Sequence, residues 1–232
     1  MLNITEIPGG VCAPRGFRAG GIRCGIKASA SAQKRDLALI YADRPCTAAA
    51  LFTTNQVKAA SVLLSREHLA SGICRAVIAN SGNANACTGA EGLLAARRMA
   101  ELAAEEFAIP PAQVAVASTG VIGVPLPIAA VESGISALAN SLRGGEAGHG
   151  AALEAIMTTD TRKKDGAFEI NIAGRPVRLG GMAKGSGMIH PNMATMLCFI
   201  TTDLAISREL LDKALRRAVR LSFNRLTVDG DT

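Results

Sequence analysis

The sequence predicts an α/β or α+β fold with mixed sheets, and three observations lead to this prediction. Short apolar runs typical of strands alternate along the chain with segments whose apolar residues repeat at helical spacing. At two places a loop of small residues joins the end of a run to the start of a helix. Hydrophobic residues make up 49% of the 232 residues, enough for a packed core. No repeat, linker or internal domain boundary is visible.

The N-terminal quarter of the chain predicts strands and turns. Apolar runs at 37–42 and 48–52 are candidate strands. Glycine pairs at 9–10 and 20–21 separate the early runs and indicate turns.

A first strand–loop–helix unit follows. The run 76–79 is a candidate buried strand, and the small residues of 80–89 indicate a loop. Thr88 and Glu91 have the spacing of a capping box at a helix start. Apolar residues then recur at helical spacing: Leu93, Ala96, Met99, Leu102 and Ala103.

A second unit repeats this order. The run 114–117 predicts a strand, 118–123 a tight loop, and 126–142 a helix entered through Pro125 and Pro127. Open α/β sheets bind ligands in loops of this kind, between the end of a strand and the start of a helix.

The last third of the chain predicts further short elements and a final amphipathic helix. They are a helix at 151–157, a hairpin over 168–179 that turns at 173–175, a strand at 193–202, a helix from its cap at Ser207 to about 222, and a strand entering a turn at 226–232.

Composition excludes several classes of protein. The N-terminus has no signal-peptide pattern, and no apolar run approaches the ~18 residues of a membrane span, so we expect a cytoplasmic protein. The net charge is +6, but the basic residues are dispersed. With no Trp and one Tyr there is little to stack on bases, so nucleic acid is not an expected partner.

Metal and nucleotide sites are also not predicted. The six cysteines form no C-x-x-C pair, which favours reduced thiols in or near the core. The three histidines lie far apart in sequence, which gives a zinc site little support. The glycine-rich motifs for phosphates and dinucleotides are missing.

One segment, residues 180–197, has the composition of a reactive loop. Glycines and Lys184 lead through a proline to Thr195, at the start of an apolar strand. An intramolecular N-to-O acyl shift requires a hydroxyl that can reach the preceding carbonyl, and a mobile loop before a rigid strand would supply it. The same residues are also compatible with an ordinary bend, a solvated lysine and a strand threonine.

The run from 182 to 197, MAKGSGMIHPNMATML, closely resembles the self-processing loop of the ornithine acetyltransferase family of arginine biosynthesis, also called the glutamate N-acetyltransferase family. Further stretches match in order, so that the resemblance covers nearly the whole chain: GGV at 9–11, PRGF at 14–17, FTTN at 52–55, NSGNAN at 80–85, STGVIG at 118–123 and MTTDT at 157–161.

The resemblance implies self-cleavage between Ala194 and Thr195. Residues 1–194 would then form an α-chain, and 195–232 would begin a β-chain that stays associated with it. The new α-amino group, whose ordinary pKa is about 7.7–8.0, would act as base for the Thr195 hydroxyl.

The resemblance also assigns the other site residues. Thr119, through its hydroxyl, and Gly120, through its backbone N–H, would stabilise the tetrahedral oxyanion. Thr158, Lys184 and Thr195 would bind substrate, with Lys184 suited to an α-carboxylate. Thr159 or Thr161 remains an alternative to Thr158.

The implied reaction is ping-pong acetyl transfer. N-acetylornithine acetylates Thr195, and glutamate then accepts the acetyl group, with no metal or organic cofactor required. Some members of the family also accept acetyl-CoA. The family fold is a layered α/β/β/α sandwich of the N-terminal-nucleophile type, and two α-chains and two β-chains form a heterotetramer.

Two alternatives to this reaction remain open. Full members of the family continue well past Thr232, where further substrate contacts lie, so the chain could be an inactive fragment that only binds its partner segment. It could also be a self-processing aminopeptidase or amidase of similar fold, because water can replace the amine that accepts the acyl group.

Overall fold

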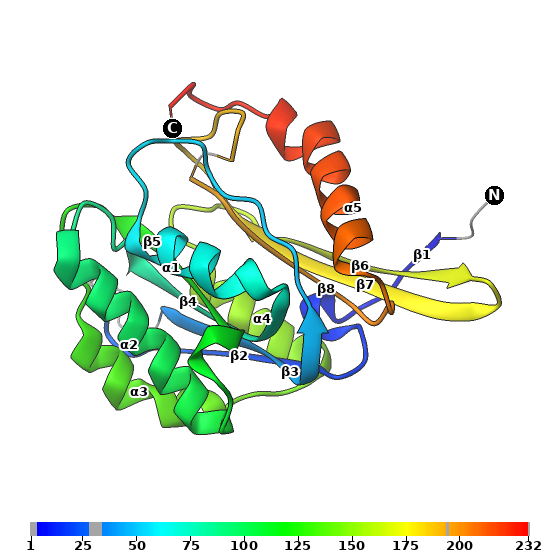
Figure 1. The fold of residues 1–232 in the computed structure, drawn as a ribbon, viewed down its shortest axis with the longest axis horizontal. Helices are drawn as coiled ribbons and strands as arrows, with labels where there is room; N and C mark the ends of the chain where they lie inside the picture. The colour runs from blue at the N-terminus through cyan, green and yellow to red at the C-terminus, as the bar shows by residue number, and fades with distance from the viewer. Residues whose placement is uncertain (1–3, 28–33, 194, 232) are drawn as a thin grey trace.

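The computed structural model describes residues 4–27, 34–193 and 195–231. Within those residues the chain forms two four-stranded sheets and five α-helices (Figure 1), which confirms the α/β class. The strands are β1 (Ile4–Glu6), β2 (Phe17–Ile22), β3 (Leu37–Thr47), β4 (Ile73–Asn83), β5 (Val114–Val121), β6 (Lys164–Ile172), β7 (Arg175–Lys184) and β8 (Leu197–Thr202). The α-helices are α1 (Ala60–His68), α2 (Gly89–Phe107), α3 (Ile128–Asn140), α4 (Gly145–Ile156) and α5 (Arg208–Leu221).

The two sheets differ in topology. The first has the order β2-β3-β4-β5 and is mixed, as predicted: β2, β3 and β4 pair antiparallel, whereas β5 runs parallel to β4. The parallel pair is possible because α2 lies in the crossover between those strands. The second sheet has the order β1-β6-β7-β8 and is antiparallel throughout.

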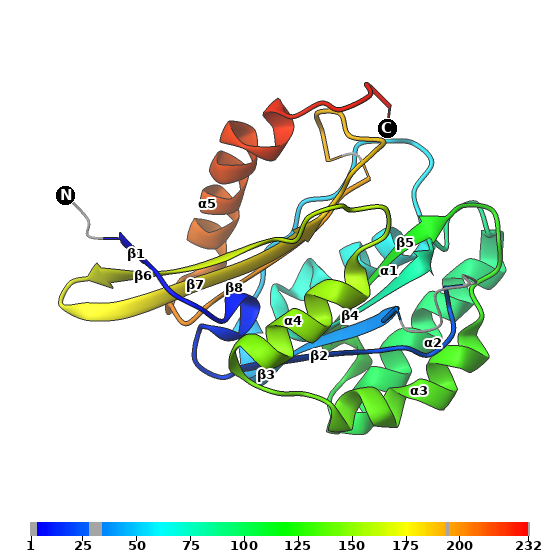
Figure 2. The same ribbon diagram turned by 180° about the vertical axis from the view of Figure 1, so that it is seen from behind.

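The first sheet is covered on both faces. Helices α1, α2 and α3 pack on one face, while α4 and the second sheet lie on the other (Figures 1 and 2). In both views α5 lies over the second sheet, away from α2 and α3. The layers therefore run from helices through two sheets to a helix.

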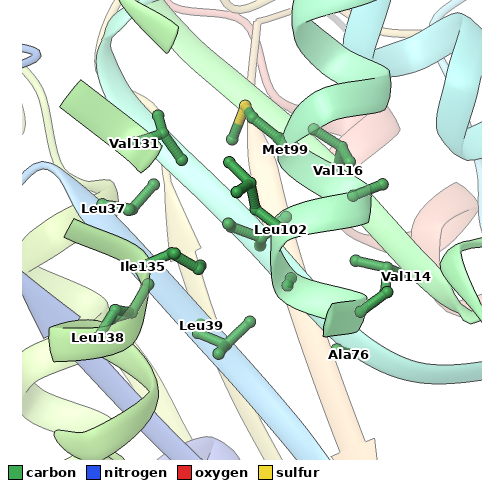
Figure 3. Packing of buried hydrophobic residues seen from close by; sticks show 14 of the residues in the cluster. Leu37, Leu39, Ala76, Met99, Leu102, Val114, Val116, Val131, Ile135 and Leu138 are labelled. Carbon is green, nitrogen blue, oxygen red and sulfur yellow. The ribbon is translucent and has the colours of Figure 1, made fainter. Parts of the chain in front are cut away.

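Alternation along β3 divides the core into two clusters. Leu37 and Leu39 face α2 and α3, whereas Ala38 and Ile40 face α4 and the second sheet. Figure 3 shows the first cluster, which includes Leu37, Leu39, Met99, Leu102, Val131, Ile135 and Leu138. Because both faces are buried, the strand is a continuous apolar run rather than an alternating one.

Strands β4 and β5 extend farther than their apolar runs predict. Residues 80–83 and 118–121 are strand rather than loop, and they pair in register as Asn80 with Ser118 and Ser81 with Thr119. The polar side chains of β4 are accommodated because Ser81 donates a hydrogen bond to the Ala155 carbonyl of α4. The Asn80 side-chain amide donates to the Asn83 carbonyl at 2.8 Å.

Three further strand predictions are wrong. Residues 48–52 and 226–231 are irregular, and β8 begins at Leu197 rather than at 193. Apolar composition alone does not make a strand where no neighbour supplies hydrogen bonds for the backbone.

Two glycine pairs predicted to form turns or bends lie inside strands, at 20–21 in β2 and at 180–181 in β7. A Cβ atom on Gly180 would lie 1.8 Å from the Gly10 carbonyl oxygen, so glycine there permits close packing of the turn at 10–12.

Helix predictions are correct in position but not in every detail. Ser207 caps α5, accepting from the Leu210 N–H at 3.4 Å, as expected. The predicted capping box is not formed, because the Thr88 hydroxyl donates to the Asn85 side chain at 2.8 Å. Helix α4 begins at Gly145, six residues before the predicted start at 151.

None of the described helices has the length and apolarity needed to cross a membrane. All six cysteines are free thiols, but Cys87 is exposed and departs from the prediction of thiols in or near the core.

Candidate active site

The candidate site lies where the ends of three strands meet. Strands β4 and β5 run parallel, so their carboxyl ends reach the same edge of the first sheet. Lys184 is the last residue of β7, in the second sheet. Its Nζ donates a hydrogen bond to Thr119 Oγ1 at 2.9 Å, which joins the two sheets at this edge.

Glycine allows β4 and β5 to approach closely beside Thr119. Gly120 pairs with Gly82, and both adopt positive φ angles, of 136° and 101°. A Cβ atom on Gly120 would lie 2.3 Å from the Gly82 carbonyl carbon, closer than any side chain tolerates. The predicted strand-to-loop turn at Gly120 is therefore a strand end whose backbone requires glycine.

Thr119 is oriented so that its hydroxyl can donate a hydrogen bond to a further group while it accepts one from Lys184. The side chain is 7% exposed and faces the second sheet, where its oxygen accepts from Lys184. A hydroxyl carries one donor hydrogen in addition to its acceptor lone pairs. Because Lys184 occupies a lone pair, the hydrogen of Thr119 remains free to donate, as an oxyanion partner must.

Lys184 is a buried cation at this edge. It is 4% exposed. Burial lowers its pKa below the ordinary lysine value, the carboxylate of Asp160 acts in the opposite direction, and Lys164 lowers the pKa further. An incompletely compensated buried cation attracts a carboxylate.

Of the three candidate threonines, Thr158 is half-buried, whereas Thr159 and Thr161 are exposed. The backbone N–H of Thr158 donates to Asp160 Oδ2 at 3.2 Å. Asp160 also binds the Gly185 N–H, next to Lys184, so the structure connects the segments carrying Thr158 and Lys184. Which threonine contacts substrate stays a prediction, although this connection favours Thr158.

Thr195 is exposed and lies two residues before β8. Its φ angle is +32°, which a β-branched residue rarely adopts. Met188, Asn192 and Met193 of the preceding loop also have positive φ. Left-handed residues of this kind cluster at functional sites, where the surrounding structure maintains backbone strain. Ala194, the other side of the predicted cleavage site, lies outside the described residues.

No hydrogen bond within the described ranges joins Thr195 to Thr119, Lys184 or Thr158. The structure therefore brings Thr119, Gly120, Lys184 and the Thr158 segment together, and leaves Thr195 outside their hydrogen-bond network.

Two aspartates that the sequence did not identify hold this region. Asp160 binds the start of the loop at Gly185, as described above. Asp229 accepts from the N–H groups of Met188, at 2.7 Å, and Ile189, at 3.1 Å, and these bonds lower its pKa. Asp160 stands in the run MTTDT and Asp229 in the run LTVDGDT, and this richness in Thr and Asp is the signal that the sequence offers for them.

Two surface hollows lie elsewhere. One of about 430 Å³ is lined by residues including His149 and Asp165, and one of about 580 Å³ by residues including Arg66 and Arg208. Neither contains Thr119, Lys184 or Thr195. The part of the chain that the structure covers has no group of three or more His, Cys, Asp or Glu placed to hold a metal ion.

Comparison with known proteins agrees with the resemblance noted in the sequence. A relative from Symbiobacterium thermophilum, named arginine biosynthesis bifunctional protein ArgJ, is 55% identical over 226 residues, which cover 97% of this chain and 56% of that protein. The chain thus spans about half the length of the curated relatives it matches.

Two solved structures are similar over 84% of this chain and 100% of theirs. One is the arginine biosynthesis bifunctional protein ArgJ of Bacillus halodurans, with 43% identity and a TM-score of 0.76. The other is ornithine acetyltransferase from Mycobacterium tuberculosis, solved with ornithine, with 39% identity and a TM-score of 0.74. The model of the ArgJ family matches residues 18–232, and the chain belongs to the ArgJ family.

Proposed function

We propose that this chain carries the self-cleaving nucleophile and the oxyanion site of an acetyltransferase, which moves an acetyl group from N-acetylornithine to glutamate in arginine biosynthesis. The observation that carries the proposal is the buried contact between Lys184 and Thr119, beside Gly120 and the strained loop that ends at Thr195. Around this contact, Lys184 would supply a cation for a carboxylate, Thr119 and Gly120 two donors for an oxyanion, and Thr195 the hydroxyl nucleophile.

Cleavage comes first in the proposed cycle. Thr195 Oγ attacks the carbonyl carbon of Ala194, the peptide C–N bond breaks, and an ester forms. Water hydrolyses the ester, leaving a carboxylate on Ala194 and a free α-amino group on Thr195. This divides the chain into residues 1–194 and a second chain that begins at Thr195.

The lengths of the solved relatives support this division. Each is matched along its whole length by 84% of this chain, and 84% of 232 residues is about 195 residues. That is close to the length of the segment that precedes Thr195.

Acetyl transfer follows by two similar steps. The α-amino group of Thr195 accepts the hydroxyl proton as Oγ attacks the acetyl carbonyl of N-acetylornithine. The Thr119 hydroxyl and the Gly120 N–H donate to the oxyanion, and removal of one such donor costs roughly 3 kcal/mol of transition-state stabilisation. Ornithine leaves with the proton, and the amine of glutamate then takes the acetyl group from Thr195.

Lys184 and Thr158 are proposed to hold the substrate. Lys184 would bind the α-carboxylate by a charge-assisted hydrogen bond. The relative from M. tuberculosis was solved with ornithine, which supports an amino-acid site of this kind. Acetyl-CoA remains a further candidate donor, and no described residue favours or disfavours it.

We further propose an assembly of two α-chains and two β-chains, as the family resemblance implies. Six free thiols support a reducing compartment, in agreement with the expected cytoplasmic location.

The decisive experiment is intact-mass analysis under denaturing conditions. The protein should separate into two chains, the second starting at Thr195. Thr195→Ala should remain one chain, and Thr195→Ser, which keeps a hydroxyl, should still cleave. Incubation with N-acetylornithine should then add one acetyl group to the Thr195 peptide, and glutamate should remove it.

A single uncut chain in a preparation that transfers acetyl groups would contradict the mechanism. Release of acetate with no transfer to glutamate would favour the amidase alternative. Cleavage without any acetyl-threonine adduct, even with the C-terminal segment of a relative added, would favour a fragment that only binds its partner.

A further inference from the structure

Asp160 is a buried carboxylate that joins the two segments carrying the proposed substrate residues. Its side chain is 1% exposed. Oδ1 accepts from the Gly185 N–H at 2.8 Å and from Lys164 Nζ at 2.7 Å. Oδ2 accepts from the Thr158 N–H at 3.2 Å. One side chain therefore fixes the backbone at Thr158 and the backbone directly after Lys184.

The charge of Asp160 is stabilised by these bonds. Burial alone would raise its pKa, but the bonds from Lys164, Gly185 and Thr158 outweigh burial, and the pKa lies below the ordinary aspartate value. Asp160 is therefore an anion throughout the neutral range.

That anion lies among several cations. Burial lowers the pKa of Lys184, Asp160 raises it, and Lys164 on β6 lowers it further. Burial lowers the pKa of Lys27, in the segment after β2, and the charge of Lys184 lowers it further. Among these charged neighbours Asp160 is the group that favours the protonated form of Lys184, since Lys164 and Lys27 repel it.

We propose that Asp160 is a positioning residue for acetyl transfer, one that fixes Thr158 and Lys184 in a common geometry and keeps the Lys184 ammonium charged for the substrate carboxylate. This inference rests on the proposed function. It assigns Asp160 no contact with the reacting atoms.

A purely structural role would have a different signature. If Asp160 only stabilises the loop, its replacement lowers stability and activity alike at every pH. If it also maintains the charge of Lys184, its replacement changes how substrate affinity depends on pH. The pH dependence of KM therefore separates the two roles.

The test uses Asp160→Asn, which keeps the size of the side chain and removes its charge. KM for N-acetylornithine should increase as Lys184 loses its proton, and this increase should begin at a lower pH in the variant than in wild type, because the carboxylate that raises the pKa of Lys184 is gone. At lower pH, where Lys184 is protonated in both proteins, kcat of the variant should stay close to the wild-type value. The larger difference between the two proteins should be in KM, at the higher pH values where KM increases.

Two further variants keep the test decisive if Asp160→Asn folds poorly. Lys164→Met removes a repelling cation, so the increase in KM should begin at a higher pH than in wild type, the opposite of the change expected for Asp160→Asn. Glu169→Gln removes a carboxylate that pairs with Arg178 at 2.9 Å elsewhere in the same sheet. It should leave the pH at which KM begins to increase unchanged.

A readout independent of turnover is the NMR titration of Lys184, in protein carrying isotope-labelled lysine. The Lys184 signal is the one missing from Lys184→Met. Its midpoint should fall in Asp160→Asn and rise in Lys164→Met.

The role of Asp160 would be overturned if Asp160→Asn and Lys164→Met changed neither the NMR midpoint of Lys184 nor the pH at which KM begins to increase. If wild-type protein transfers no acetyl group but the NMR midpoint moves as expected, the proposed function fails while the influence of Asp160 on Lys184 stands.

Discussion

Replacement of Gly120 by alanine tests whether the close approach of β4 and β5 forms the site. The new Cβ atom would lie 2.3 Å from the Gly82 carbonyl carbon and 2.5 Å from the Asn83 nitrogen. Both neighbours are backbone atoms, so no side-chain rotation relieves the contact. The strand ends must separate by about 0.7 Å even to reach 3.0 Å, the practical minimum for a Cβ contact.

Two costs contribute to the expected loss of stability. Forcing extra atoms into a packed region costs about 1–3 kcal/mol. Holding an L-residue at a φ of 136° costs about 1–3 kcal/mol more. Gly120→Ala should therefore lower the free energy of unfolding by about 2–6 kcal/mol.

Gly123→Ala is the matched control. Gly123 also has a positive φ, of 80°, but nothing lies within 4 Å of the point that a Cβ atom would occupy, so its replacement carries the backbone cost alone. The difference between the variants, about 1–3 kcal/mol, isolates the steric contact.

Urea unfolding of both variants measures this difference, and acetylation of Thr195 measures the effect on the site. A displacement near 1 Å can slow a reaction about 100-fold, so Gly120→Ala should acetylate far more slowly than Gly123→Ala. Equal stability and equal acetylation rates in the two variants would refute the assignment of Gly120.

Two further predictions concern the charges around the site. Lys184→Met should increase KM for N-acetylornithine about 10- to 150-fold, because a hydrogen bond to a charged group contributes about 1.5–3 kcal/mol. The same variant should be at least as stable as wild type in urea at pH 7. Burial lowers the pKa of Lys184, so protonation in the folded state costs stability, and this advantage should shrink as pH rises through the folded pKa. Asp229→Asn should speed hydrogen exchange at Met188 and Ile189, whose N–H groups lose a charged acceptor. Because the pKa of Asp229 is lowered, wild-type protection should persist above the ordinary aspartate pKa of about 3.9 and disappear as pH falls through the folded pKa; unchanged protection in the variant would count against this role.

The sequence predicted the elements whose signals are local. The hairpin of β6 and β7 and the cap of α5 depend on residues close together in the chain, and both formed as expected. The ends of β4 and β5 were not predicted, because Asn80 and Ser118 are residue types typical of loops. They belong to the sheet because they pair with each other across the two strands, which the sequence does not show.

For the site, the family motifs identified Thr119, Lys184 and Thr158, and the structure brings their segments together. Asp160 and Asp229 could not be found in this way. Their partners lie 25 residues away, at Gly185, and 41 residues away, at Met188. Such bonds depend on the tertiary fold, which composition and spacing do not determine.

The pairing of β7 with β8 has a consequence for a nicked molecule. A cut before Thr195 would leave β7 in one product and β8 in the other, still joined by a ladder from Leu179 with Thr202 to Lys184 with Leu197. The hydrogen bonds that the Met188 and Ile189 N–H groups donate to Asp229 would also cross between the products. We therefore expect the two polypeptides to stay associated, so that they migrate as one particle in gel filtration and separate in denaturant.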